Sequence, residues 1–314
     1  MVRFAAHRLG ILVLSLVGAS VLVFGALTLL PGSPAQVILG TQATPQSVHH
    51  LTVQLGLDKP LWQQYFDWLH GMVTGALGTS YVSQLPIGTQ IWQALQVTGP
   101  LVLLGLVIGL VIAIPLGLFG ALLQGRATGA VLGAIGQVGL AVPTFVGGTL
   151  LIIVFAVEFH VLPASGFPEW SHPGSALKSL LLPAISLGVV EGGIISRYLR
   201  TSVLDLLQSD YLRTARMKGL SMGQALRRHG LRNAMLPLVT VGGLELAGLI
   251  VGAIVVENVF TLPGIGTLLL TSVNNRDLLV AQDIVMFVSG TVLVLNLLVD
   301  LSYRLLDPRL AGRS

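Results

Sequence analysis

Long apolar stretches dominate the chain and alternate with shorter polar segments. Six of these stretches are close to or longer than the roughly 20 residues that a helix needs to cross a bilayer. A removable signal peptide is the competing interpretation of the first one. Its apolar run exceeds the ~7–15 residues of a signal core, and no clear cleavage site follows. The pattern therefore predicts an all-α integral membrane fold with six transmembrane helices, over residues 9–30, 98–124, 129–157, 180–199, 233–256 and 284–305.

The longest polar stretch, residues 31–97, separates the first two predicted spans. It is expected to contain two short helices, near residues 44–55 and 60–73. Thr44 and Pro45 fit an N-cap followed by proline at the first helical position. The aromatic residues of this stretch fit either a membrane interface or a small packed cap. We predict a helical loop outside the cytoplasm between helices 1 and 2.

Basic residues are distributed unevenly between the two sides of the predicted bilayer. Of the 17 Lys and Arg residues, all except Lys59, Lys178 and Arg276 fall on one side. Cytoplasmic loops carry the excess of Lys and Arg, so this side is assigned to the cytoplasm together with both termini. Only 10% of the residues are charged, against about 25% in a soluble domain. Because topology explains the excess of basic residues, nucleic acid is not predicted as a partner.

The longest strongly charged stretch, residues 211–237, lies between the fourth and fifth predicted spans. It holds six of the 17 Lys and Arg residues and no acid. Within it, apolar or small side chains recur with helical spacing and predict one face of a helix. That face consists of Leu212, Ala215, Gly219 and Leu220. The small residues Ala215 and Gly219 are expected to let another surface approach closely.

A second short helix is predicted after a break at Gly219. Ser221 and Gln224 have the spacing of a capping box at its start. Arg228 and Arg232 are four residues apart and are expected to lie together if that stretch is helical. Two interpretations of the basic residues stay open. They fix topology or touch anionic lipid, or they surround a docking surface for a partner.

At these residues the sequence resembles a known family. YLRTARMKGL at 211–220, followed by RNAMLP at 232–237, resembles the cytoplasmic signature loop of ABC importer permeases, closest to the dipeptide/oligopeptide branch. Arg213-Thr-Ala215 stands where the general signature begins Glu-Ala-Ala. Ser33 and Ala76 stand where the family usually has Asp. Further matches are LPGSP at 30–34, QLGLDKP at 54–60, GALGTS at 75–80, LPASG at 162–166, VENVF at 256–260, PGIG at 263–266, NLLVD at 296–300 and LDPR at 306–309.

The resemblance implies a type I ABC importer permease fold in a bacterial cytoplasmic membrane. The expected parts are an N-terminal segment with the first helix (1–30), an extracytoplasmic loop (31–97), a five-helix core (98–305) with a cytoplasmic coupling loop (200–232), and a cytoplasmic tail (306–314). Such a subunit forms half of the translocation pathway for di- or oligopeptides. A permease for another ligand such as a nickel chelate, a stand-alone secondary transporter and an intramembrane enzyme are the alternatives.

The same resemblance implies the partners. They are a second, similar permease in a heterodimer, two cytoplasmic ATP-binding subunits, an extracytoplasmic substrate-binding protein or lipoprotein, and membrane lipid. The ATP-binding subunits are expected to dock on Leu212, Arg213, Thr214, Ala215, Arg216, Lys218, Gly219 and Leu220. The sequence contains no P-loop motif. ATP and Mg are therefore expected on partner subunits, and this chain is expected to have no cofactor, metal site or catalytic residue and not to be an enzyme.

Three acids fall within or at the end of predicted spans. Glu191 and Glu245 lie near the middle of the fourth and fifth spans, and Glu257 lies at the outer end of the fifth. An unpaired charge at such depth costs at least about 2.5 kcal/mol. One interpretation is a cavity that favours a positive group such as a peptide amine. The other, favoured for Glu191 and Glu245, is a protonated side chain hydrogen-bonded between helices.

Overall fold

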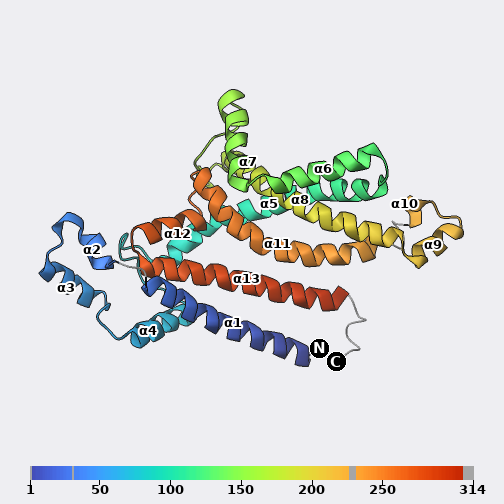
Figure 1. Cartoon of the computed structure of the whole chain (residues 1–314). Coiled ribbons are helices and arrows are strands. Elements are labelled where there is room, and N and C mark those ends of the chain that lie inside the picture. Colours follow the sequence, from blue (N-terminus) through green and yellow to red (C-terminus); the bar gives the residue numbers. More distant parts are fainter. Residues whose placement is uncertain (1, 30–31, 226–230, 307–314) are drawn as a thin grey trace. The chain divides into compact units, whose positions relative to one another are not determined.

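The computed structural model describes residues 2–29, 32–225 and 231–306. Helices make up most of these ranges (Figure 1). The pairing of Thr79 with Pro86 is an isolated bridge, and no strand is assigned within the described ranges. The predicted all-α class is therefore confirmed.

Five described helices are long and apolar enough to cross a membrane. A sixth candidate is a bent pair, because α6 (Ala127–Ala141) and the segment Thr144–Glu158 meet at an angle of 99°. The second arm consists of α7 (Thr144–Leu151) and a π-helix (Ile152–Glu158). The count is six when this pair is one span. The five continuous helices are α1 (Val2–Thr28), α5 (Ile87–Leu122), α8 (Pro173–Leu207), α11 (Leu231–Val259) and α13 (Leu278–Leu306).

The two short helices predicted before the second span are present as α3 (Pro45–Gln54) and α4 (Leu61–Thr74). Thr44 caps α3, since its side chain accepts a hydrogen bond from the Ser47 N–H at 3.2 Å. The Ser47 hydroxyl oxygen accepts one from the Thr44 N–H at 2.9 Å, which completes a capping box.

Three features of these loops differ from the prediction. Helix α2 (Pro34–Leu39) and a 3₁₀ turn (Gly40–Gln42) were not expected. Helix α5 begins at Ile87, well before the predicted start at residue 98, because the polar first turns of the helix masked its periodicity. The segment expected to be a loop before the last span holds α12 (Ile265–Asn274), which is too short to be recognised as a span.

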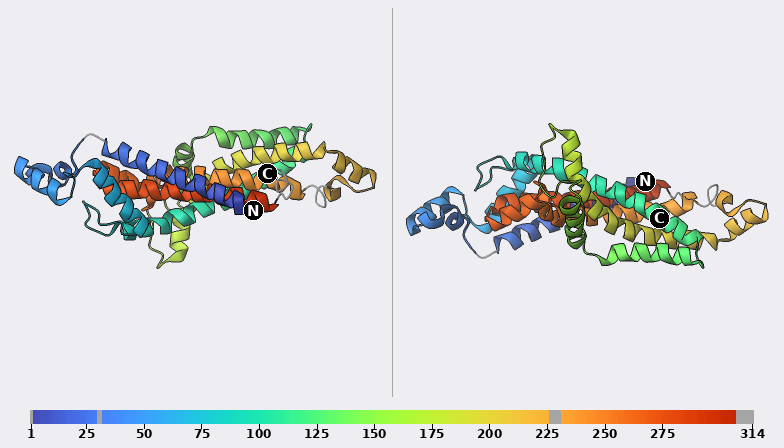
Figure 2. Two further views of the ribbon diagram at one scale, coloured as in Figure 1. Left: turned by 90° about the horizontal axis from the view of Figure 1, so that it is seen from below. Right: turned by 90° about the horizontal axis from the view of Figure 1, so that it is seen from above.

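The described chain divides into two compact units, and α5 and α13 contribute to both. The first, called the α8 unit, comprises residues 99–262 and those from 295 onward. Within it α8 packs against α6, α7 and α11. Figures 1 and 2 show α6 and α11 running alongside α8. Helix α8 is the most deeply buried candidate span, with 72% of its most apolar window inside the protein.

Glycines let the helices of the α8 unit approach closely. A Cβ atom at Gly117 of α5 would lie 2.8 Å from the Ser196 carbonyl oxygen of α8. One at Gly193 of α8 would lie 2.8 Å from the Gly136 carbonyl oxygen of α6. Gly109 of α5 likewise faces α8, where its Cβ would lie 3.1 Å from the Glu191 side chain. Helices surrounded by lipid gain little from the hydrophobic effect when they associate. Close packing at small residues stabilises their contact instead.

The second unit, called the α4 unit, comprises residues 2–98 and 263–294. Figure 2 shows α1 alongside α13, and their side chains meet around Val23, Trp68 and Met286. The Asp277 carboxylate accepts hydrogen bonds from the Ser80 hydroxyl and from the N–H of Tyr81 at 3.3 Å. These bonds join segments almost 200 positions apart, which holds the loop after α4 against the start of α13.

The glycine contacts predict a specific packing defect. Gly117→Ala places a methyl group against a backbone carbonyl, and overpacking of this kind costs about 1–3 kcal/mol. Gly18→Ala on α1 is the matched control, because no atom lies within 4 Å of its Cβ position and alanine favours a helix by about 1 kcal/mol. Thermal unfolding of the protein in detergent should show a lower midpoint only for Gly117→Ala. Equal midpoints for the two variants would contradict the close packing of α5 on α8.

Candidate functional site

The segment after α8 forms a short helix, α9 (Asp210–Met217), and the predicted docking residues lie in this helix and in the turn that follows it. The acid of Asp210 lies in its first turn, where a negative charge stabilises the helix dipole. The helix ends with Gly219 at φ +90°, and the Leu220 N–H donates to the Ala215 carbonyl oxygen at 3.4 Å. This is the pattern of a Schellman motif, in which glycine supplies the left-handed residue. The predicted break at Gly219 is confirmed.

The inner face of α9 packs on the chain itself. Leu212 is fully buried and Ala215 is 8% exposed, in a cluster with Leu207 and Leu220. The expectation that Ala215 offers a partner a flat, accessible surface is therefore wrong. The reason is local, because the Schellman turn brings Leu220 back onto the last turn of α9.

The outer face of α9 is polar and exposed. Arg213, Thr214, Lys218 and Gly219 are all exposed, and Met217 is 79% exposed. The Arg216 side chain lies outside the described residues. This face combines positive charge with one large, flexible apolar side chain, and methionine adapts readily to an irregular partner surface. Among the described residues of the predicted loop, this face is one part that another protein can reach.

A second short helix, α10 (Met222–Ala225), follows the turn. The Ser221 N–H donates to the Gln224 side-chain oxygen at 3.1 Å, and the Gln224 N–H donates to the Ser221 hydroxyl oxygen at 3.3 Å. The predicted capping box is confirmed. Arg228 and the Arg232 side chain lie outside the described residues, so their predicted proximity stays a prediction.

Two of the three intramembrane acids come together in the α8 unit. Glu191 of α8 is 4% exposed, and its Oε1 makes no hydrogen bond with the residues that the structure describes. Glu245 lies on α11, which packs against α8. Glu257 is fully buried near the other end of α11. The choice between a substrate cavity and an interhelical hydrogen bond stays a prediction.

A second polar cluster, in the α4 unit, was not anticipated. Asp283 is 1% exposed and its Oδ1 accepts a hydrogen bond from the Trp68 indole N–H at 2.7 Å. Burial, and then the charges of Asp277 and Asp283, raise the pKa of the Tyr81 hydroxyl above its ordinary value of 10.0. The available signal was an acid at the start of an apolar run, since such a residue needs a partner. Its partner Trp68 is too distant in sequence to be inferred.

Two family models match the chain. The first, described as the binding-protein-dependent transport system inner membrane component, matches residues 113–312, which include α8, α9 and α11. The chain belongs to this family. The model for the N-terminal part of such components matches residues 1–99.

Curated relatives of this family are similar over nearly their whole length. The dipeptide transport system permease protein DppB of Alkalihalophilus pseudofirmus is 35% identical, with 99% of both chains covered. DppB of Escherichia coli is 33% identical over 99% of both chains. The glutathione transport system permease protein GsiC of E. coli is 37% identical over 98% of both chains.

The fold also resembles that of one chain of a solved transporter. The chain resembles a chain of the inward-facing MetNI methionine ABC transporter with a TM-score of 0.56 and 16% identity. The match covers 71% of this chain and 98% of that one. The predicted ABC importer permease fold is confirmed. The family match and the apolar helices together show that the chain is a multi-pass protein of the cytoplasmic membrane.

The buried face of α9 predicts which substitutions free the helix. Leu212→Ala leaves a hole in the cluster beneath α9 and costs about 2–5 kcal/mol. Met217→Ala is the control, because that side chain is 79% exposed. Amide hydrogen exchange should quicken across residues 210–217 for Leu212→Ala and stay unchanged for Met217→Ala. Unchanged exchange in both variants would contradict the anchoring of α9 by Leu212.

Proposed function

We propose that this inner-membrane component forms half of the translocation pathway of an ATP-driven importer for small peptides. The observation that carries the proposal is that relatives named for dipeptide and for glutathione transport are 33–37% identical along almost the whole chain. Glutathione is itself a short peptide, so the relatives share one substrate class. A second, similar permease is the proposed other half of the pathway.

ATP hydrolysis belongs to partner subunits in this proposal. The sequence lacks a P-loop, the loop that cradles nucleotide phosphates. ATP and Mg are therefore assigned to two cytoplasmic subunits, and the substrate to an extracytoplasmic binding protein. Both termini and α9 are assigned to the cytoplasm, because nearly all Lys and Arg residues fall on that side of the predicted spans.

The outer face of α9 is the proposed docking surface for an ATP-binding subunit. Arg213, Met217 and Lys218 are exposed there, whereas Leu212 and Ala215 attach the helix to the end of α8. Force applied to α9 then passes to α8 through this buried cluster. Because α8 packs against α6, α7 and α11, its displacement acts on the α8 unit as a whole.

Reconstitution tests the proposed transport function. The full assembly, with both permeases, the ATP-binding subunits and the binding protein, is placed in liposomes and uptake of a labelled dipeptide is measured. ATP-dependent accumulation is the expected result, and a nickel chelate should not accumulate. Uptake of the chelate but not of the dipeptide would contradict the proposed peptide substrate. Uptake by this chain without ATP-binding subunits, driven by an ion gradient, would overturn the importer mechanism.

The Schellman turn gives a sharper test of coupling. Gly219→Val puts a β-branched residue at a positive φ, which costs roughly 1–2 kcal/mol or more and should misdirect the end of α9. Gly223→Val is the matched control, because Gly223 also has open space around it but lies in α10 without a positive φ.

In the reconstituted assembly, Gly219→Val should lower substrate-stimulated ATPase activity and transport, while membrane insertion stays normal. Gly223→Val should retain both activities. Normal transport by Gly219→Val would place the docking surface elsewhere.

A further inference from the structure

A cavity of about 480 Å³ lies within the α4 unit. Helices α1, α2, α3, α4 and α13 and the loops between them line it. Its volume falls in the range of small-molecule sites, about 300–1,000 Å³. Aromatic side chains contribute to its wall through Phe24, Trp68 and Tyr81.

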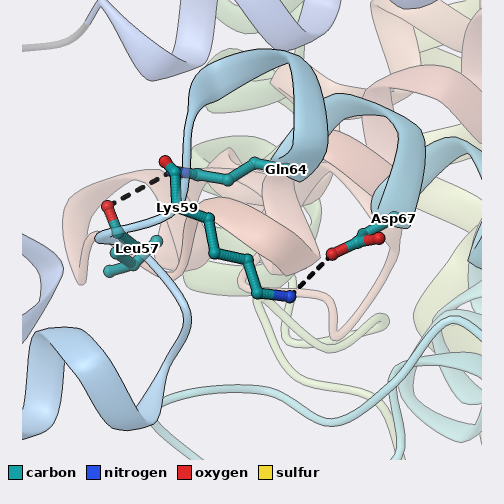
Figure 3. A network of polar contacts seen from close by, with 4 residues as sticks. All are labelled: Leu57, Lys59, Gln64 and Asp67. Carbon is teal, nitrogen blue, oxygen red and sulfur yellow. Dashed lines mark hydrogen bonds and ion pairs between the residues drawn. The ribbon is translucent and has the colours of Figure 1, made fainter.

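The rim of the cavity carries a balanced pair of charges. Lys59 Nζ lies 2.8 Å from Asp67 Oδ2, and both side chains are about half exposed. Gln64 fixes the preceding turn, since its amide nitrogen donates to the carbonyl oxygens of Leu57 at 3.2 Å and Lys59 at 2.7 Å. Figure 3 shows Lys59 reaching toward Asp67 and Gln64 reaching back toward Leu57. Each charge of this pair is therefore compensated by the other.

The buried carboxyl of the lining is not compensated in this way. Asp283 is 1% exposed, and one of its oxygens accepts the hydrogen bond from Trp68. The other, Oδ2, makes no hydrogen bond with any residue that the structure describes. A buried carboxylate is stable only with a cation or with hydrogen-bond donors. When Asp283 is ionised, the lining carries one net negative charge beside aromatic rings.

We propose that this cavity binds a small organic molecule through a protonated amino group, with Asp283 as its counter-ion. An ammonium group in the cavity supplies the positive charge that a buried carboxylate needs nearby. The rings of Trp68 and Tyr81 are positioned in the wall, where aromatic faces attract organic cations. An inorganic metal site is not indicated, because no group of three or more His, Cys, Asp or Glu side chains forms one in the described residues.

The inference concerns this chain alone and does not require the proposed transport function. Binding is measured by calorimetry on the full-length protein in lipid nanodiscs. The probe is glycylglycinamide, which carries one ammonium group and no carboxylate, and the comparison probe is its neutral N-acetyl derivative. The first should bind and the second should not. Absence of binding by the first, or equal binding of both, would overturn the proposal.

Variants locate the site within the protein. Asp283→Asn keeps an oxygen to accept the Trp68 hydrogen bond but removes the charge, so affinity should fall about ten- to hundredfold. Asp58→Asn is the matched control, because Asp58 is exposed and does not line the cavity. A folded Asp283→Asn protein with unchanged affinity would overturn the assignment.

A second pair of variants changes an exposed residue of the cavity wall. This test remains valid even if Asp283→Asn does not fold. Ala76 lines the cavity and is exposed. Ala76→Trp should block binding by filling the cavity, and Ala76→Asp should raise the affinity by adding a carboxylate. Unchanged affinity in both variants would contradict a site in this cavity, whatever the outcome of the transport assay.

Discussion

Close approach of helix backbones is the constraint on which the α8 unit depends. Lipid gives two apolar helices little reason to associate, so packing of small residues must hold them. At Gly117 and Gly193 a single added carbon would fall 2.8 Å from a carbonyl oxygen of the neighbouring helix. These contacts hold α8 against both α5 and α6, with no room for an added carbon at either glycine. A helix held in this way has little freedom to shift without its neighbours, and the proposed coupling role of α8 rests on that packing.

The end of α8 leads into α9, which is attached to it on one face and exposed on the other. Leu212 and Ala215 attach α9 to Leu207 and to the returning Leu220. The face opposite remains exposed, with Arg213 and Lys218 beside Met217. The described basic side chains of this segment are therefore exposed, whereas Leu212 and Ala215 are buried. Arg213, Lys218 and Met217 face outward, and Leu212 and Ala215 hold α9 to the end of α8.

Hydropathy was sufficient to predict the long spans, because each apolar run exceeds what a short loop helix contains. It could not reveal the 99° bend after Ala141 or the ten-residue helix α12. The helical spacing identified the apolar face of α9 but not its burial, since that depends on Leu220 folding back after Gly219. The contact of Asp283 with Trp68 joins residues 215 positions apart, and no local pattern encodes it.

The most direct test of α9 as the docking element is site-specific cross-linking at Met217. The chain contains no cysteine, so Met217→Cys provides a unique thiol. A short thiol-to-amine cross-linker should join it to an ATP-binding subunit in the assembled transporter. Leu14→Cys, at an exposed position of α1, should give no such product. Absence of the Met217 product in an assembly that transports normally would contradict the docking of ATP-binding subunits on α9.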